Sequence, residues 1–186
     1  LAATPAESGT QRLRALYDGS LDGLALDPDI RWSVLRALAA RDAVDAEELE
    51  AEKARDNTLT GAAAYLGVSH AFPSAEVKRE VFDLVRTPGK YSNAEVDSLL
   101  AAFNAPRSAH LTEAFAQEYF DSLSQLWEEH PIEIANRLVR GLYPDLAMAD
   151  AATSEFLGSE RPRALRRVLL ECQDALRRAH RVRAAQ

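Results

Sequence analysis

Residues 50–61, with the sequence EAEKARDNTLTG, join a charged helical run to a cluster of small polar residues. Asp56, Asn57 and Thr58 place carboxylate, amide and hydroxyl oxygens close together, a combination that can ligate a metal ion. The same residue types also cap helices and turn corners, and a glycine such as Gly61 lets a second helix approach closely. The composition favours this second interpretation. We therefore predict that Asp56, Thr58 and Gly61 form a structural corner between two helices.

The histidines do not form a recognisable metal-binding motif. None is followed by Glu, so the H-E-x-x-H motif of zinc peptidases is absent. His110 with Glu113, and His130 with Glu133, have H-x-x-E spacing, whereas di-iron bundles need two Glu-x-x-His pairs and two further carboxylates. Both pairs lie near expected helix starts, where these side chains are commonly solvated. We therefore expect no metal ligand and no cofactor site in this chain.

The sequence offers no activated nucleophile either. Cys172 lies on the apolar stripe of the last expected helix, which indicates a buried and inert thiol. There is no G-x-S-x-G motif and no glycine-rich phosphate loop. The acidic run Glu47, Glu48 and Glu50 is typical of a solvated helix face. We predict no catalytic residue, and we interpret the two tryptophans, Trp32 and Trp127, as core anchors.

Composition sets further bounds on the class of protein. The chain has 186 residues, 47% of them apolar and 27% charged, which fits one domain over residues 1–186. Its net charge of −7 argues against nucleic acid as a partner. A single cysteine cannot form an internal disulfide, so a reducing, cytoplasmic location is expected. No apolar run reaches the ~18 residues of a membrane span. Because the sequence does not begin with Met, we expect it to be a fragment of a longer protein.

The charge is unevenly distributed along the chain. Residues 161–186 hold eight Arg and two acids, which gives this segment a net charge of +6. Since the whole chain carries −7, the first 160 residues carry a net charge of −13. These arginines can pair with acids of neighbouring helices or of a missing domain, recognise an anionic group such as a peptide carboxylate, or contact nucleic acid. The first interpretation is the most economical. Contact with nucleic acid is the least favoured, because the segment has no aromatic residues between its arginines.

The apolar residues recur every three or four positions almost throughout, which predicts helices. One such stripe consists of Leu165, Val168, Leu169, Cys172, Leu176 and Ala179. Helix starts are indicated by Asp27-Pro28 and by two pairs with capping-box spacing, Asp45 with Glu48 and Ser92 with Glu95. No alternating strand pattern is found. The predicted fold is all-α, with about nine or ten helices joined by short connections as antiparallel hairpins in a curved, HEAT-like α-solenoid array.

Several segments recur in a characteristic order along the chain. They are LDPDIRWSVLRAL at 26–38, ELEAE at 48–52, DNTLTG at 56–61, PSAEVK at 73–78, YF at 119–120, Trp127, RGLYP at 140–144, ALRRVLLE at 164–171, Asp174 and RRA at 177–179. In this order they resemble the C-terminal helical domain of the bacterial aminopeptidase N family of zinc metallopeptidases. The D-x-T-x-x-G corner and the R-W-x-x-L segment are the more specific pieces. The resemblance covers residues 10–183.

The resemblance implies a role for the chain. Full-length relatives have an N-terminal β-domain, a thermolysin-like catalytic domain with zinc held by H-E-x-x-H and a downstream Glu, and this helical domain last. Neither the zinc motif nor the G-A-M-E-N-like segment that binds the substrate amine is present here. The chain is therefore expected to be inactive alone, with zinc in the absent catalytic domain. It would cover the active-site cavity and help to bind and orient peptides, so its expected partners are its own catalytic domain and peptide substrates.

The arginines near the C-terminus are the candidate contacts to a peptide carboxylate, because guanidinium groups suit carboxylates. The candidates are Arg163, Arg166, Arg167 and Arg177. The alternative function is a stand-alone helical scaffold that binds a partner protein through its concave surface. An H-E-x-x-H motif several hundred residues upstream in the same reading frame would favour the peptidase over the scaffold.

Overall fold

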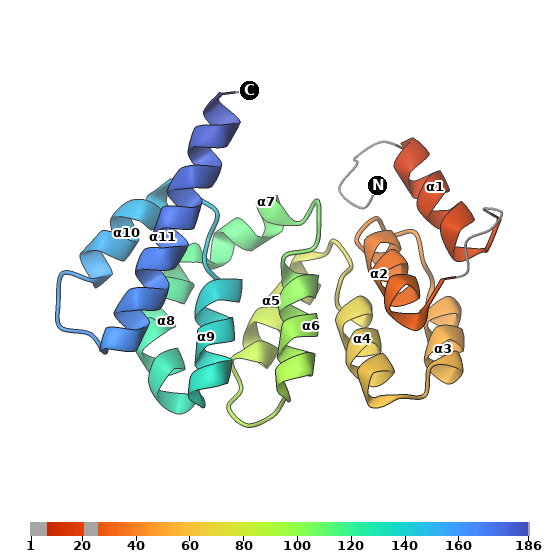
Figure 1. Ribbon diagram of the computed structural model, residues 1–186, viewed down its shortest axis with the longest axis horizontal. Coiled ribbons are helices and arrows are strands. Elements are labelled where there is room, and N and C mark those ends of the chain that lie inside the picture. The colour runs from red at the N-terminus through yellow and green to blue at the C-terminus, as the bar shows by residue number, and fades with distance from the viewer. Residues whose placement is uncertain (1–6, 21–25, 186) are drawn as a thin grey trace. The chain divides into compact units, whose positions relative to one another are not determined.

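The computed structural model describes residues 7–20 and 26–185, and helices are their only regular elements (Figure 1). The elements are α1 (Glu7–Tyr17), α2 (Pro28–Ala39), α3 (Ala46–Arg55), α4 (Leu59–Ser69), α5 (Ala75–Val85), α6 (Asn93–Phe103), α7 (Ala109–Thr112), the 3-10 turn η1 (Glu113–Phe115), α8 (Ala116–Glu129), α9 (Ile132–Gly141), α10 (Met148–Phe156) and α11 (Arg163–Ala184). The all-α prediction is confirmed for this part of the chain. No described helix is long and apolar enough to cross a membrane.

The helix starts follow the signals in the sequence. The Asp27 side chain caps α2 by accepting from the Ile30 N–H at 2.8 Å, and Pro28 occupies the first helical position. Both expected capping boxes form, Asp45 with Glu48 at α3 and Ser92 with Glu95 at α6. Each cap satisfies backbone N–H groups that have no partner inside the helix. Local sequence therefore decides where these helices begin.

The chain divides into two compact units, residues 1–111 and residues 112–186. Within the first unit, consecutive helices pack as pairs, α1 with α2, α3 with α4 and α5 with α6, and α4 also packs against α2 and α6. Within the second unit, α8 packs against α9 and α10, and α11 packs against α9 and α10. These pairs are the helical hairpins that the sequence predicted. The single-domain prediction for residues 1–186 stays a prediction.

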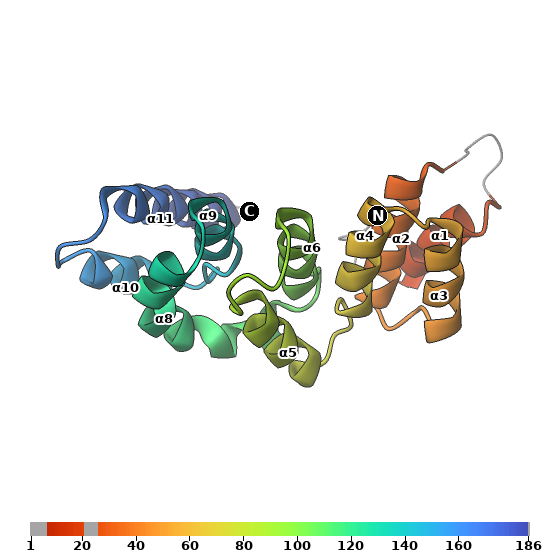
Figure 2. The ribbon, with the colours of Figure 1, turned by 90° about the horizontal axis from the view of Figure 1, so that it is seen from below.

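The core of the first unit is built on α2. Its buried side chains include Trp32, Leu35 and Leu38, which pack with Leu13 from α1 and Leu49 from α3. Figures 1 and 2 both show α2, α3 and α4 side by side. A residue of α2 can therefore touch the corner between α3 and α4, and Trp32 lies beside Asp56 at this corner.

Helices α4 and α6 approach each other closely at Gly67. A Cβ atom at Gly67 would lie 2.8 Å from the Ser98 carbonyl oxygen and 2.9 Å from the Ser98 Cβ. Only glycine leaves room for this contact. Lys78, from α5, lies at the C-terminal ends of these helices, fully buried, where its ammonium donates to the carbonyl oxygens of Ala71 and Ala102.

The core of the second unit is formed by the apolar faces of α8, α9 and α11. Tyr119 is fully buried, and its hydroxyl donates to the Val139 carbonyl oxygen at 2.8 Å. The predicted stripe of α11 is buried from Leu165 to Leu176, while Ala179 is half-buried. Burial of this stripe leaves the arginines of α11 on its exposed side. Packing thus turns the basic residues of the helix toward solvent.

Candidate functional site

The segment between α3 and α4 is a network of side-chain hydrogen bonds. Asp56 ends α3, and its carboxylate accepts from the Trp32 Nε1–H at 2.8 Å and from the Thr58 hydroxyl at 2.7 Å. The Thr58 oxygen accepts in turn from the Gly61 N–H at 2.9 Å and so caps α4. These bonds connect α2, α3 and α4. The hydrogen bond from Thr58, and after it that from Trp32, lowers the pKa of the Asp56 carboxyl below its ordinary value.

Gly61 is the residue that lets this corner close. A Cβ atom there would lie 2.6 Å from both Cγ and Oδ2 of Asp56 and would also clash with the Asp56 carbonyl oxygen. The backbone of Gly61 does not adopt a positive φ, so a glycine is required here by the close packing and not by the backbone conformation. The geometry supports the interpretation of Asp56, Thr58 and Gly61 as a structural corner.

The two tryptophans occupy different environments. Trp32 is 4% exposed and makes an edge-to-face contact with Tyr65 at a centroid distance of 6.4 Å. Trp127 is half-buried. Trp32 has the contacts of a core anchor with a satisfied N–H group. The same role for Trp127 stays a prediction.

Two buried charged residues of the first unit were given no role from the sequence. Glu52, which is 2% exposed, accepts from the Arg31 guanidinium at 2.6 and 2.8 Å, from Arg55 at 3.1 Å and from the Tyr17 hydroxyl at 3.3 Å. Burial alone would raise the pKa of Glu52, but the hydrogen bonds and charge of Arg31 outweigh it, so that this pKa lies below its ordinary value. Glu52 follows the buried Leu49 by three positions, which is the signal that could have placed it on the buried face.

Lys78 is the second such residue. It stands at helical spacing with Val81, Phe82 and Val85, which are the buried face of α5. No described carboxylate forms an ion pair with it. Burial lowers the pKa of the Lys78 ammonium to about 8. It contacts backbone carbonyls and no reactive side chain, so its role in the first unit is structural.

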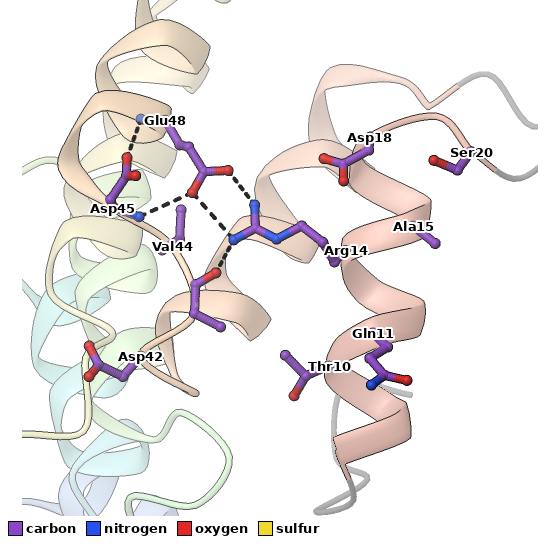
Figure 3. Close-up of a pocket in the computed structure, with 11 residues that line it drawn as sticks. Thr10, Gln11, Arg14, Ala15, Asp18, Ser20, Asp42, Val44, Asp45 and Glu48 are labelled. Atoms are coloured by element: carbon purple, nitrogen blue, oxygen red, sulfur yellow. Dashed lines mark hydrogen bonds and ion pairs between the residues drawn. The ribbon is translucent and has the colours of Figure 1, made fainter.

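A polar cleft of about 760 Å³ lies between α1 and the start of α3 (Figure 3). Arg14 spans it, with hydrogen bonds to the Glu48 carboxylate and to the Ala43 carbonyl oxygen. Glu48 is therefore paired and half-buried, whereas Glu47 and Glu50 of the same acidic run are exposed, as expected of a solvated face. Carboxylates of Asp18, Asp42 and Asp45 also line the cleft, and its described lining contains no histidine, cysteine or lysine. Its described lining thus offers no thiol, amine or imidazole for catalysis.

The four arginines of α11 that were predicted to contact a peptide carboxylate have different partners in the structure. Arg177 donates to Asp150 at 2.6 Å, and Arg167 lies 3.5 Å from Glu171. Arg166 donates to the Leu157 carbonyl oxygen at 3.0 Å. Arg163 forms no hydrogen bond or ion pair with any described residue. Two of the four candidates, Arg167 and Arg177, are therefore paired with acids of the second unit, Glu171 on α11 itself and Asp150 on α10.

The helix spacing also separates these arginines. Arg163, Arg166 and Arg167 share the first turns of α11, whereas Arg177 lies ten residues beyond Arg167. At 1.5 Å per residue this is about 15 Å along the helix axis. The two groups therefore lie about three turns apart on α11.

The described residues contain no group of three or more His, Cys, Asp or Glu side chains placed to hold a metal ion. Of the two H-x-x-E pairs, His110 is exposed, but His130 is buried, so the expectation of solvated histidines was wrong for His130. The Cys172 thiol is buried as expected, and burial raises its pKa to about 11. A thiol with this pKa is a poor nucleophile at neutral pH.

Comparison with known proteins identifies the family. Residues 1–178 match the family model described as the ERAP1-like C-terminal domain. The chain is also 32% identical over 179 residues to Aminopeptidase N of Streptomyces lividans, an alignment that covers 93% of this chain and 21% of that protein. The chain therefore spans about a fifth of the length of this relative. It belongs to the ERAP1-like C-terminal domain family and is the C-terminal domain of an aminopeptidase N-like protein.

Proposed function

We propose that this chain is the non-catalytic C-terminal domain of a zinc-dependent aminopeptidase, that it covers the active-site cavity and that it helps to bind and orient peptide substrates. The observation that carries the proposal is the family match over residues 1–178 together with the likeness to an aminopeptidase N. The helices of the two units supply a scaffold, and the exposed side chains of α11 supply the basic surface.

The zinc that the family implies does not fit the residues described here, because they provide no set of three ligands. In this proposal the ion belongs to a catalytic domain that precedes the chain, and the domain described here takes no part in activating water. Its contribution is to position the part of the peptide that lies far from the cleaved bond. Such binding energy from remote parts of a substrate can be used to accelerate the reaction.

Arg163 and Arg166 are the candidates for contact with the carboxylate of the peptide. Neither is paired with an acid, and both are exposed on the first turns of α11. Guanidinium groups bind carboxylates through two parallel hydrogen bonds. Arg167 and Arg177 would first have to leave Glu171 and Asp150. We therefore assign the contact to the first pair.

The test is kinetic and uses the full-length enzyme. Arg163→Gln combined with Arg166→Gln should lower kcat/KM for a nonapeptide about tenfold, which corresponds to one charge-assisted hydrogen bond. It should leave kcat/KM for a single aminoacyl anilide unchanged, because that substrate does not extend to the domain. Arg178→Gln is the matched control, since Arg178 pairs with Asp174 one turn away on the same helix. An unchanged kcat/KM for the nonapeptide in the double variant would refute the assignment.

A further inference from the structure

A small pocket in the second unit lies between α11 and the segment that follows α9. Its volume is about 260 Å³, and its apolar lining includes Pro144, Ala175, Leu176 and Ala179, together with the thiol of Cys172. Such a lining favours an apolar occupant, because the occupant leaves water without losing hydrogen bonds. The volume is sufficient for one aromatic or branched aliphatic group.

The rim of this pocket carries an excess of positive charge on one side. Arg140 lines the pocket and donates to Oε2 of Glu171, whose other oxygen lies 3.5 Å from the guanidinium of Arg167. Two arginines thus share a single carboxylate, which leaves a net charge of one positive unit. The hydrogen bond from Arg140 lowers the pKa of the Glu171 carboxyl. Glu171 is therefore ionised at neutral pH.

The other side of the rim is electrically balanced. Asp145 lines the pocket, but its carboxylate accepts from Arg183 at 2.8 Å and lies 3.3 Å from Nε2 of His180. The charge of Asp145 is thus neutralised by groups of α11. An anion in the pocket would meet the unbalanced Arg140 side rather than a free carboxylate.

Arg140 can exchange Glu171 for a ligand with little loss of folding free energy. Arg140 and Glu171 are each 46% exposed, and ion pairs of this kind contribute little to stability. If Arg140 turns to a ligand, Glu171 keeps Arg167 as its partner and no charge is left alone. The arrangement therefore supplies a cation that is available beside an apolar pocket.

We propose that this pocket binds a small carboxylate with an aromatic or branched apolar body, the body among Pro144, Cys172 and Leu176 and the carboxylate on Arg140. This assignment goes beyond the proposed function and does not depend on it. The same chemistry occurs in free aromatic acids and in the C-terminal residue of a peptide.

Cys172 supplies a direct readout, because it lines the pocket and is the sole cysteine of the chain. The probe is 3-phenylpropanoate, and the rate of Cys172 alkylation by iodoacetamide is followed by intact mass at pH 10, because burial raises the pKa of this thiol to about 11 and a higher pH supplies the reactive thiolate. At ten times its Kd the probe should slow alkylation about tenfold, because the occupied fraction of the chain is protected. The neutral amide of the same acid is the matched ligand and should protect much less at equal concentration.

Three variants locate the effect. Arg140→Gln should remove the preference for the acid over the amide, and Ala175→Trp, which fills the pocket from the exposed side of α11, should abolish protection by both. Arg178→Gln removes the same charge away from the pocket and should leave the preference intact. The proposal is overturned if the acid gives no protection, if acid and amide protect equally, or if Arg140→Gln keeps the preference.

A second ligand identifies the source of the carboxylate. N-acetyl-glycyl-phenylalanine carries the same side chain and carboxylate on a peptide backbone. Stronger protection by this blocked dipeptide than by 3-phenylpropanoate would assign the pocket to peptide ends, and the reverse order would assign it to free acids. Because no peptidase activity is measured, failure here would leave the proposed function untouched, and failure of the kinetic test on Arg163 and Arg166 would leave this binding result untouched.

Discussion

The side-chain ammonium of Lys78 donates a hydrogen bond to the carbonyl oxygen of Ala102 across 2.6 Å, deep inside the first unit. A longer bond of 3.4 Å reaches the Ala71 carbonyl oxygen. These oxygens lie at the C-terminal ends of α6 and α4, where helix dipoles concentrate partial negative charge. One lysine of α5 thus holds the ends of two neighbouring helices.

Lys78 should give stability an unusual dependence on pH. Its pKa in the folded chain is about 8, below the value of 10.5 for an exposed lysine, so the unfolded chain binds more protons between these values. Stability contributed by this group therefore rises as pH increases from 8 to 10.5. From pH 7.5 to pH 10, wild type should gain about 2 kcal/mol in unfolding free energy relative to Lys78→Met.

Urea unfolding of both chains at the two pH values measures this gain. Comparing wild type with the variant cancels the titration of other groups, including Cys172, whose pKa of about 11 gives the opposite trend above pH 9. A difference between the two chains that does not change with pH would show that Lys78 titrates as an exposed lysine does.

Glu52 should be required for the stability of the first unit. Glu52→Gln removes the charge that faces Arg31 in a nearly solvent-free site, and an unpaired buried charge is costly. We expect the unfolding free energy to fall by about 3 kcal/mol at pH 7. Glu47→Gln on the exposed side of the same helix is the control and should change it by less than about 0.5 kcal/mol.

Glu52 should also make the stability of the folded chain depend on pH in the acid range. The pKa of Glu52 is lowered in the folded chain, so its contribution is present above the ordinary glutamate pKa and is lost as pH falls through the folded value. Acid titration followed by circular dichroism should show a loss of stability below about pH 4 that is smaller in Glu52→Gln than in wild type. Parallel acid titrations of the two chains would contradict this.

Asp56→Ala should destabilise the corner without touching any chemistry. The substitution removes the acceptor of the Trp32 indole N–H and of the Thr58 hydroxyl. A lost cap of this kind should lower Tm by about 2–4 °C in a chain of this length. Asp56→Asn keeps one acceptor oxygen and should lower Tm less. Unchanged Tm in Asp56→Ala, combined with loss of peptidase activity in the full-length enzyme, would show that the corner has a functional role.

Gly61→Ala should be more damaging than its size suggests. The added methyl group would lie 2.6 Å from the Asp56 side chain, so α3 and α4 must move apart at their junction. Overpacking of this kind costs about 1–3 kcal/mol. Ala62→Ser, on the exposed neighbouring position, provides the control. Equal denaturation midpoints for the two variants would mean that the corner relaxes freely.

Local sequence was sufficient for the helices and their starts. Helical periodicity, the Asp27-Pro28 start and the two capping boxes act within one or two turns, so the residues themselves carry the information. The buried stripe of α11 followed from the same periodicity. The corner at Asp56, Thr58 and Gly61 was also predictable, because side-chain caps and close glycine contacts are made by neighbours in sequence.

What the sequence determined by itself was therefore an all-α chain with known helix starts and a family likeness. The tertiary structure decided which charges are buried and which partners they have. Periodicity places Glu52 on the face of Leu49 and Lys78 on the face of Val81, but it does not give what covers those faces, so neither the burial of the two charges nor their partners could be predicted. Nor could it pair Arg140 with Glu171 or Arg177 with Asp150, since these contacts join residues 31 and 27 positions apart. Such pairs form only when separate helices pack, because a side chain can contact only those elements that the fold places beside it.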